Sequence, residues 1–162
     1  MTSERTKCVR MGGVRSVSAE LQHLCNGAAA VFKEKSAPSH TLDVFDSTCA
    51  PDIHIRDYLV RVVSYVPLDK AQFLLAIEYL DRYLCTRSDV LSPTSVHRLV
   101  AVAMVLAHKF DSDFPLSDVC YGRIFGIPHT ELMNLQMIFM KRLQYRLMYP
   151  IILRDVRECA AQ

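Results

Sequence analysis

Residues 94–110, T-S-V-H-R-L-V-A-V-A-M-V-L-A-H-K-F, are apolar around nearly the whole circumference when they are read as a helix. Apolar residues recur in this run at steps of three and four, which is the helical period. They are Val96, Leu99, Val100, Ala103, Met104, Ala107 and Phe110, and Ala101, Val102, Val105 and Leu106 fill most of the remaining surface. A helix that is apolar all round lies either inside a bundle of helices or in a membrane.

The bundle is the better interpretation of this run. From Pro93 to Phe110 the run is a poor bilayer span, because polar residues interrupt it at both ends. Ser92 can cap the first unpaired N–H groups, and Pro93 suits the first helical position because proline has no N–H to leave unpaired. We therefore predict a central buried helix over residues 93–110.

The composition of the 162-residue chain favours one well-packed domain, since 51% of its residues are hydrophobic and 22% are charged. The net charge of +2 gives no broad electrostatic attraction to nucleic acid or to a membrane surface. The start of the chain, M-T-S-E-R-T-K-C-V-R, has no apolar stretch of signal-peptide length. We expect an intracellular protein, in the nucleus and/or the cytoplasm.

Further apolar stripes at helical spacing predict an all-α fold, and no strand-like alternation competes with them. The additional helices are predicted at 16–35, 51–65, 70–85 and 116–125, with a last one that starts at Pro128 and continues to Leu147. The chain is accordingly divided into a flexible tail (1–15), an N-terminal amphipathic helix with its connector (16–50), a bundle (51–150) and a C-terminal extension (151–162). Whether the N-terminal helix packs on the bundle or on a partner is left open.

The sequence offers little evidence of an enzyme. It contains no G-x-x-x-x-G-K, G-x-G-x-x-G or H-E-x-x-H motif, and its six cysteines lack the close spacing of a metal site. Free thiols are the better interpretation of the cysteines than disulfides or zinc ligands. Nothing brings a candidate nucleophile such as Cys120 near His129. No catalytic residue, cofactor or metal site is predicted.

Five segments in a fixed order resemble a cyclin box, specifically that of the single-box P/U-type cyclins of phosphate-signalling kinases. They are Y-L-V-R-V-V-S-Y (58–65), I-E-Y-L-D-R-Y-L (77–84), S-V-H-R-L (95–99), A-H-K-F (107–110) and T-E-L-M-N-L-Q-M-I-F-M-K-R-L-Q-Y-R-L (130–147). The resemblance implies a five-helix bundle around a buried third helix. It also implies a regulatory subunit that binds and activates a cyclin-dependent Ser/Thr kinase by positioning the kinase's αC helix and activation loop.

The resemblance assigns candidate roles to individual residues. Lys109 matches the family's lysine that bonds backbone carbonyls of the kinase, and Phe110 follows it at the expected interface. Gln136 stands where most cyclins have a glutamate that works beside this lysine, and Glu131 lies about 140° away round the helix, so it is not assumed to substitute. Three further residues are either interface or core: Leu132, Met133 and Met140. Arg61 and Asp81 match a structural ion pair between the first two helices of the box.

Three alternatives remain open. Cyclin-fold domains also occur in transcription factors that bind DNA, although such domains are usually more basic than this chain. The chain could bind a kinase as a scaffold without activating it, since Gln136 lacks the usual charge. An unrecognised all-α enzyme would require a pocket lined by titratable groups. The expected partner is a cyclin-dependent kinase, with no direct nucleic-acid contact, no membrane and no required homo-oligomer.

Overall fold

The computed structural model describes residues 16–35, 44–86 and 91–148. These residues form six α-helices, which confirms the predicted all-α class. The helices are α2 (Ala19–Lys35), α3 (Ile55–Tyr65), α4 (Lys70–Cys85), α5 (Val96–Asp111), α6 (Asp118–Phe125) and α7 (His129–Arg142). The predicted tail (1–15) and C-terminal extension (151–162) lie outside the described residues.

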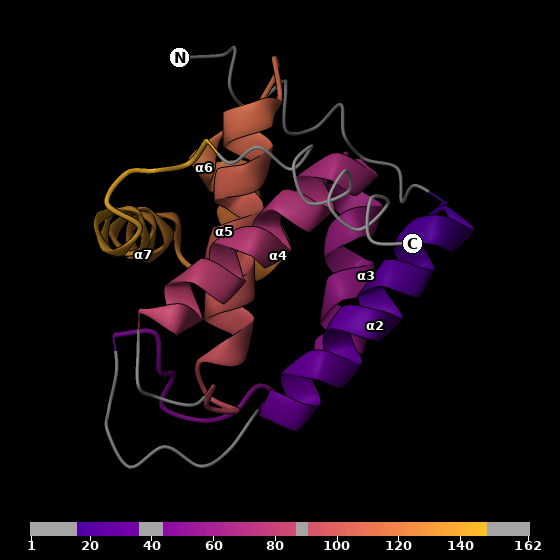
Figure 1. The fold of residues 1–162 in the computed structure, drawn as a ribbon, viewed down its shortest axis with the longest axis horizontal. Helices are drawn as coiled ribbons and strands as arrows, with labels where there is room; N and C mark the ends of the chain where they lie inside the picture. The colour runs from indigo at the N-terminus through magenta and orange to yellow at the C-terminus, as the bar shows by residue number, and fades with distance from the viewer. Residues whose placement is uncertain (1–15, 36–43, 87–90, 149–162) are drawn as a thin grey trace, which may run out of the picture.

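Helix α5 is the buried centre of the fold, as its sequence predicts. Nearly all of its side chains from Val96 to His108 are buried, and Arg98 is the half-buried exception. It packs most extensively against α4 and also contacts α3 and α7. Figure 1 shows α5 between α7 on one side and α2 and α3 on the other. A helix surrounded in this way has to be apolar on every face.

The start of α5 differs from the prediction. The helix begins at Val96, after a turn in which the Ser92 carbonyl accepts hydrogen bonds from the N–H groups of Ser95 (3.1 Å) and Val96 (3.0 Å). The Ser92 hydroxyl bonds that of Thr94 at 2.7 Å. Pro93 therefore belongs to the turn rather than to the first helical position, because Ser92 organises a tight turn before the helix starts.

Other helix boundaries are set by caps. Asp69 and Gln72 form a reciprocal capping box at the start of α4, as the aspartate suggested. Helix α3 begins at Ile55 rather than at residue 51, without a side-chain hydrogen bond from its N-cap, His54. Helix α6 begins after Ser117, whose side chain accepts a hydrogen bond from the Cys120 N–H, and not at residue 116.

Helix α7 ends at Arg142, so the predicted continuation to Leu147 is wrong. Gln144 and Tyr145 adopt left-handed backbone conformations, with φ of 53° and 56°, and a helix cannot continue through them. The Tyr79 hydroxyl of α4 donates to the Leu147 carbonyl at 2.7 Å. The apolar stripe continued past the helix because this segment also packs on the core, although it is not helical.

The N-terminal helix α2 packs on the bundle, which answers the question left open by the sequence. Its buried side chains are Cys25, Ala29 and Phe32, and it contacts α3 and α4. Polar contacts flank this packing. Lys70 bonds Glu20 at 2.7 Å, and Arg56 bonds Asn26 at 2.7 Å.

Gly122 allows the close approach of α6 to the start of α7. A Cβ at this position would lie 2.7 Å from the Ile127 carbonyl oxygen and 3.2 Å from the His129 nitrogen. We expect Gly122→Ala to destabilise the fold by about 1–3 kcal/mol, because backbone has to move to admit the methyl group. Gly27→Ala in α2 is the matched control: a Cβ there meets nothing within 4 Å, so we expect a gain of up to about 1 kcal/mol. Urea unfolding of both variants measures the difference, and equal effects would contradict this packing.

Candidate functional site

The predicted interface residue Lys109 is held where three helices meet. Its ammonium donates to Asp118 Oδ1 on α6 at 2.5 Å and to Gln136 Oε1 on α7 at 3.0 Å. The same ammonium lies 5.6 Å from the centre of the Tyr121 ring, within the range of a cation–π contact. Lys109 and Asp118 are both half-buried, so the last turn of α5 presents an oriented but partly accessible positive charge.

Gln136 is buried, and both its amide nitrogen and its amide oxygen form hydrogen bonds. Only 5% of its surface is exposed. Its amide nitrogen donates to Asp118 Oδ1 (3.4 Å) and to the Leu132 carbonyl (3.2 Å), while its oxygen accepts from Lys109. An amide can donate and accept at once, whereas a carboxylate at this position could only accept. Gln136, the residue that departs from the expected pattern, therefore contributes hydrogen bonds to this cluster.

The remaining predicted interface residues separate by burial. Phe110 and Met133 are 46% and 49% exposed, Met140 is half-buried, and Leu132 is fully buried. Leu132 is consequently part of the core in this structure. Met137, which is 46% exposed and one helical turn after Met133, shares their face of α7 and was missed. The spacing of Met133, Met137 and Met140 could have indicated it.

We call Phe110, Met133, Met137 and Met140 the α5–α7 apolar patch. The hydrogen bond between Lys109 and Gln136 joins the end of α5 to α7, the helix that carries the three methionines. Flexible thioether side chains adapt to a partner's surface, and a patch of this kind is typical of a protein interface.

Two other polar contacts were considered in the sequence. Arg61 on α3 is exposed and Asp81 on α4 is half-buried, and the structural ion pair between them stays a prediction. Glu131 pairs with Arg98 at 2.7 Å rather than with Lys109. This agrees with its expected position round the helix from Gln136.

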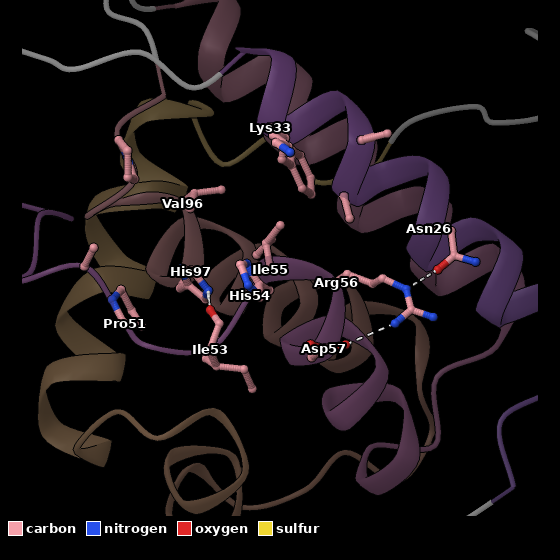
Figure 2. A pocket seen from close by; sticks show the side chains of 15 residues that line it. Asn26, Lys33, Pro51, Ile53, His54, Ile55, Arg56, Asp57, Val96 and His97 are labelled. Carbon is pink, nitrogen blue, oxygen red and sulfur yellow. Dashed lines mark hydrogen bonds and ion pairs between the residues drawn. The ribbon is translucent and has the colours of Figure 1, made fainter.

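A pocket of about 580 Å³ lies at the other end of α5, between α2 and the segment that leads into α3. Figure 2 shows His97 and Ile53 on one side of it and Asn26 and Arg56 on the other. His97 Nε2 bonds the Ile53 carbonyl at 2.9 Å, whereas its buried Nδ1 has no hydrogen-bond partner. Arg56 bonds Asn26 and Asp57. His97 is about 18 Å along the helix from Lys109, so this pocket is separate from the Lys109 cluster.

The described residues give little support to a metal site or to a catalytic cysteine. No group of three or more His, Cys, Asp or Glu side chains in the described ranges is arranged to hold a metal ion. Cys25, Cys49 and Cys85 are free thiols, as predicted. Cys120, in contrast, is disulfide-bonded, which corrects the prediction that the cysteines are free and removes this sulfur as a candidate nucleophile.

A family comparison adds to this geometry. The family model for cyclins matches residues 11–147, which is more than half of the chain. The chain belongs to the cyclin family. Members of this family are regulatory subunits rather than enzymes. The matched region includes α2 as well as residues 51–147 of the predicted box.

Curated proteins similar to this cyclin include P- and U-type cyclins, as the sequence motifs indicated. Cyclin-P3-1 of Oryza sativa is 33% identical over 64% of this chain and 44% of its own length. Cyclin-U3-1 of Arabidopsis thaliana is 32% identical over 66% of this chain and 48% of its own length. The Nuc-1 negative regulatory protein preg of Neurospora crassa is 30% identical over 70% of this chain and 24% of its own length. The chain therefore spans about half, or less, of the length of these curated relatives. In the part that the structure describes, no helix has both the length and the hydrophobicity to cross a membrane.

His108, next to the Lys109 cluster, is expected to make the stability of this cyclin depend on pH. Burial lowers the pKa of His108 below its ordinary 6.5, while Asp69 and Asp111 act in the opposite direction, and burial also lowers the pKa of His97. The unfolded chain therefore takes up protons first as the pH falls below about 6.5, so the free energy of unfolding decreases there. The His108 Nδ1 contacts the Tyr121 hydroxyl at 2.6 Å.

We expect the free energy of unfolding to be lower at pH 5.5 than at pH 7.5, and His108→Gln to reduce this difference. Urea unfolding at both pH values measures it. His129→Gln, at an exposed histidine in α7, is the control and should leave the pH dependence unchanged. A pH dependence equally large in the His108 variant would show that other groups cause it.

Proposed function

We propose that this cyclin binds a cyclin-dependent Ser/Thr protein kinase and activates it. The observation that carries the proposal is the oriented Lys109 beside the exposed α5–α7 apolar patch. Membership of the cyclin family supports the kinase as the class of partner.

The chemistry of this surface suits a helix of the kinase and the backbone that follows it. The patch supplies apolar area, and Lys109 supplies donors for carbonyl oxygens at a helix end, where unpaired carbonyls gather. Asp118 and Gln136 reduce the entropic cost of ordering the lysine on binding, because they already hold it. We propose that α5 and α7 contact the kinase's αC helix through this surface.

Activation requires a preference and not only affinity. A partner that binds the active arrangement of the kinase more tightly than the inactive one shifts the population toward it. A shift from 1:99 to 99:1 requires a difference of about 5.5 kcal/mol. By holding αC inward, the cyclin would favour the lysine–glutamate pair that kinases need for phosphoryl transfer.

A scaffold that binds the kinase without activating it is the second candidate. The observation that favours it is Gln136, which is neutral and buried, so α7 offers no carboxylate beside Lys109. Both candidates predict binding, and only activation separates them.

The binding test is co-purification of tagged protein from lysate of its own source, with the captured proteins identified by mass spectrometry. We expect a cyclin-dependent kinase with the wild type and a loss of at least about tenfold with Met137→Asp, because a charge enters the apolar patch. Val31→Asp is the matched control, since Val31 is 45% exposed on α2, away from the patch. Equal capture by both variants would place the interface elsewhere. Capture of no kinase by the wild type would contradict the function.

A further inference from the structure

The negative charge that holds Lys109 comes from α6 and not from α7. Asp118 is the carboxylate bonded to the lysine, at 2.5 Å. Glu131, the acidic residue at the start of α7, is engaged by Arg98 at 2.7 Å. Gln136 is adjacent to the lysine but carries no charge.

The three side chains form a closed triangle of hydrogen bonds. Asp118 Oδ1 accepts from both Lys109 and Gln136, and the Gln136 oxygen accepts from Lys109. The triangle holds one cation, one anion and one neutral amide, so it is electrically balanced. Each of these three contacts joins two different helices. Asp118 also lies in the first turn of α6, where the helix dipole favours a carboxylate.

We infer that Asp118 is the residue that positions Lys109 for its partner, and that position 136 has to be neutral because Asp118 already supplies the charge. The part of this inference that concerns the kinase rests on the proposed function. The arrangement of the lysine does not.

The inference predicts that the two positions can exchange their charge. Asp118→Asn leaves the lysine without a carboxylate, and Gln136→Glu adds a second carboxylate within hydrogen-bond distance of the first. Two carboxylates around a single ammonium repel each other, and the second would replace the amide donor that Asp118 now accepts from. The double variant Asp118→Asn/Gln136→Glu restores one cation, one anion and one amide. We expect each single variant to be impaired and the double variant to recover.

The first readout is the rate at which Lys109 is acylated by an N-hydroxysuccinimide ester, measured by mass spectrometry relative to exposed Lys33. We expect Asp118→Asn to raise this ratio at least about threefold, and the double variant to return it close to the wild-type value. Asp113→Asn removes an exposed carboxylate from the turn before α6 and should leave the ratio unchanged. General unfolding would also expose the half-buried Lys109 and raise the ratio, so circular dichroism first has to show that each variant is as folded as the wild type.

The second readout is the dissociation constant for the kinase identified by co-purification. We expect it to rise about tenfold in Asp118→Asn and to recover in the double variant. An unchanged labelling ratio in Asp118→Asn, or a double variant no better than the single one in both readouts, would overturn the inference. If the wild type binds no cyclin-dependent kinase, the proposed function fails, and the labelling ratios still decide whether Asp118 positions Lys109.

Discussion

Replacing Lys109 with glutamate is expected to weaken kinase binding at least about 100-fold, or about 3 kcal/mol. The change removes the positive charge at the end of α5 and puts a carboxylate against Asp118, which now lies 2.5 Å from the ammonium. It also deprives Gln136 of the donor that its oxygen accepts from. Titration of purified wild type and variant against the kinase measures the effect.

Two further variants make this result interpretable. Lys109→Met removes the charge without adding repulsion, so it should disturb the fold less than glutamate does and still bind weakly. Lys33→Glu makes the same charge reversal on α2, which Figure 1 places on the opposite side of α5 from α7, and it should bind normally. Wild-type affinity in Lys109→Met would show that the lysine makes no contribution to the interface.

Replacing Phe139 with alanine is expected to have the largest effect on stability, a loss of about 3–5 kcal/mol. The Phe139 ring is fully buried on α7 and stacks on Tyr83 of α4, with ring centres 4.5 Å apart. Phe45 meets both rings edge-on, at 5.5 Å from Tyr83 and 6.2 Å from Phe139. Truncation therefore leaves a cavity and removes two aromatic contacts.

Urea unfolding measures this loss, and Phe114→Ala is the control because Phe114 is 87% exposed in the turn before α6. We expect the control to lie within about 0.5 kcal/mol of the wild type. A loss below about 1 kcal/mol in Phe139→Ala would mean that the three rings do not form the core described here.

The helices and their order could be predicted because they depend on periodicity and on short-range caps. The apolar circumference of α5 required burial, and Asp69 marked the start of α4. The start of α5 and the end of α7 were less predictable. The turn at Ser92 and the left-handed residues Gln144 and Tyr145 are backbone conformations that no hydrophobic pattern encodes.

The site was predictable only in part, for a physical reason. Family motifs pointed to Lys109 and Gln136, which the structure brings within 3.0 Å. Asp118, the carboxylate that pairs with Lys109, lies on a third helix. Its contact with the lysine depends on how α6 folds back onto α5. Burial separates Leu132 from Met133 although they are neighbours in the sequence, because adjacent residues on a helix face different directions.

The most direct measurement is the phosphorylation rate of the captured cyclin-dependent kinase, with and without a saturating amount of this protein. Activation predicts an increase of at least about tenfold that Lys109→Glu abolishes at the concentration where wild type saturates. A kinase that binds the protein but whose rate stays unchanged would contradict activation and leave a scaffold as the function.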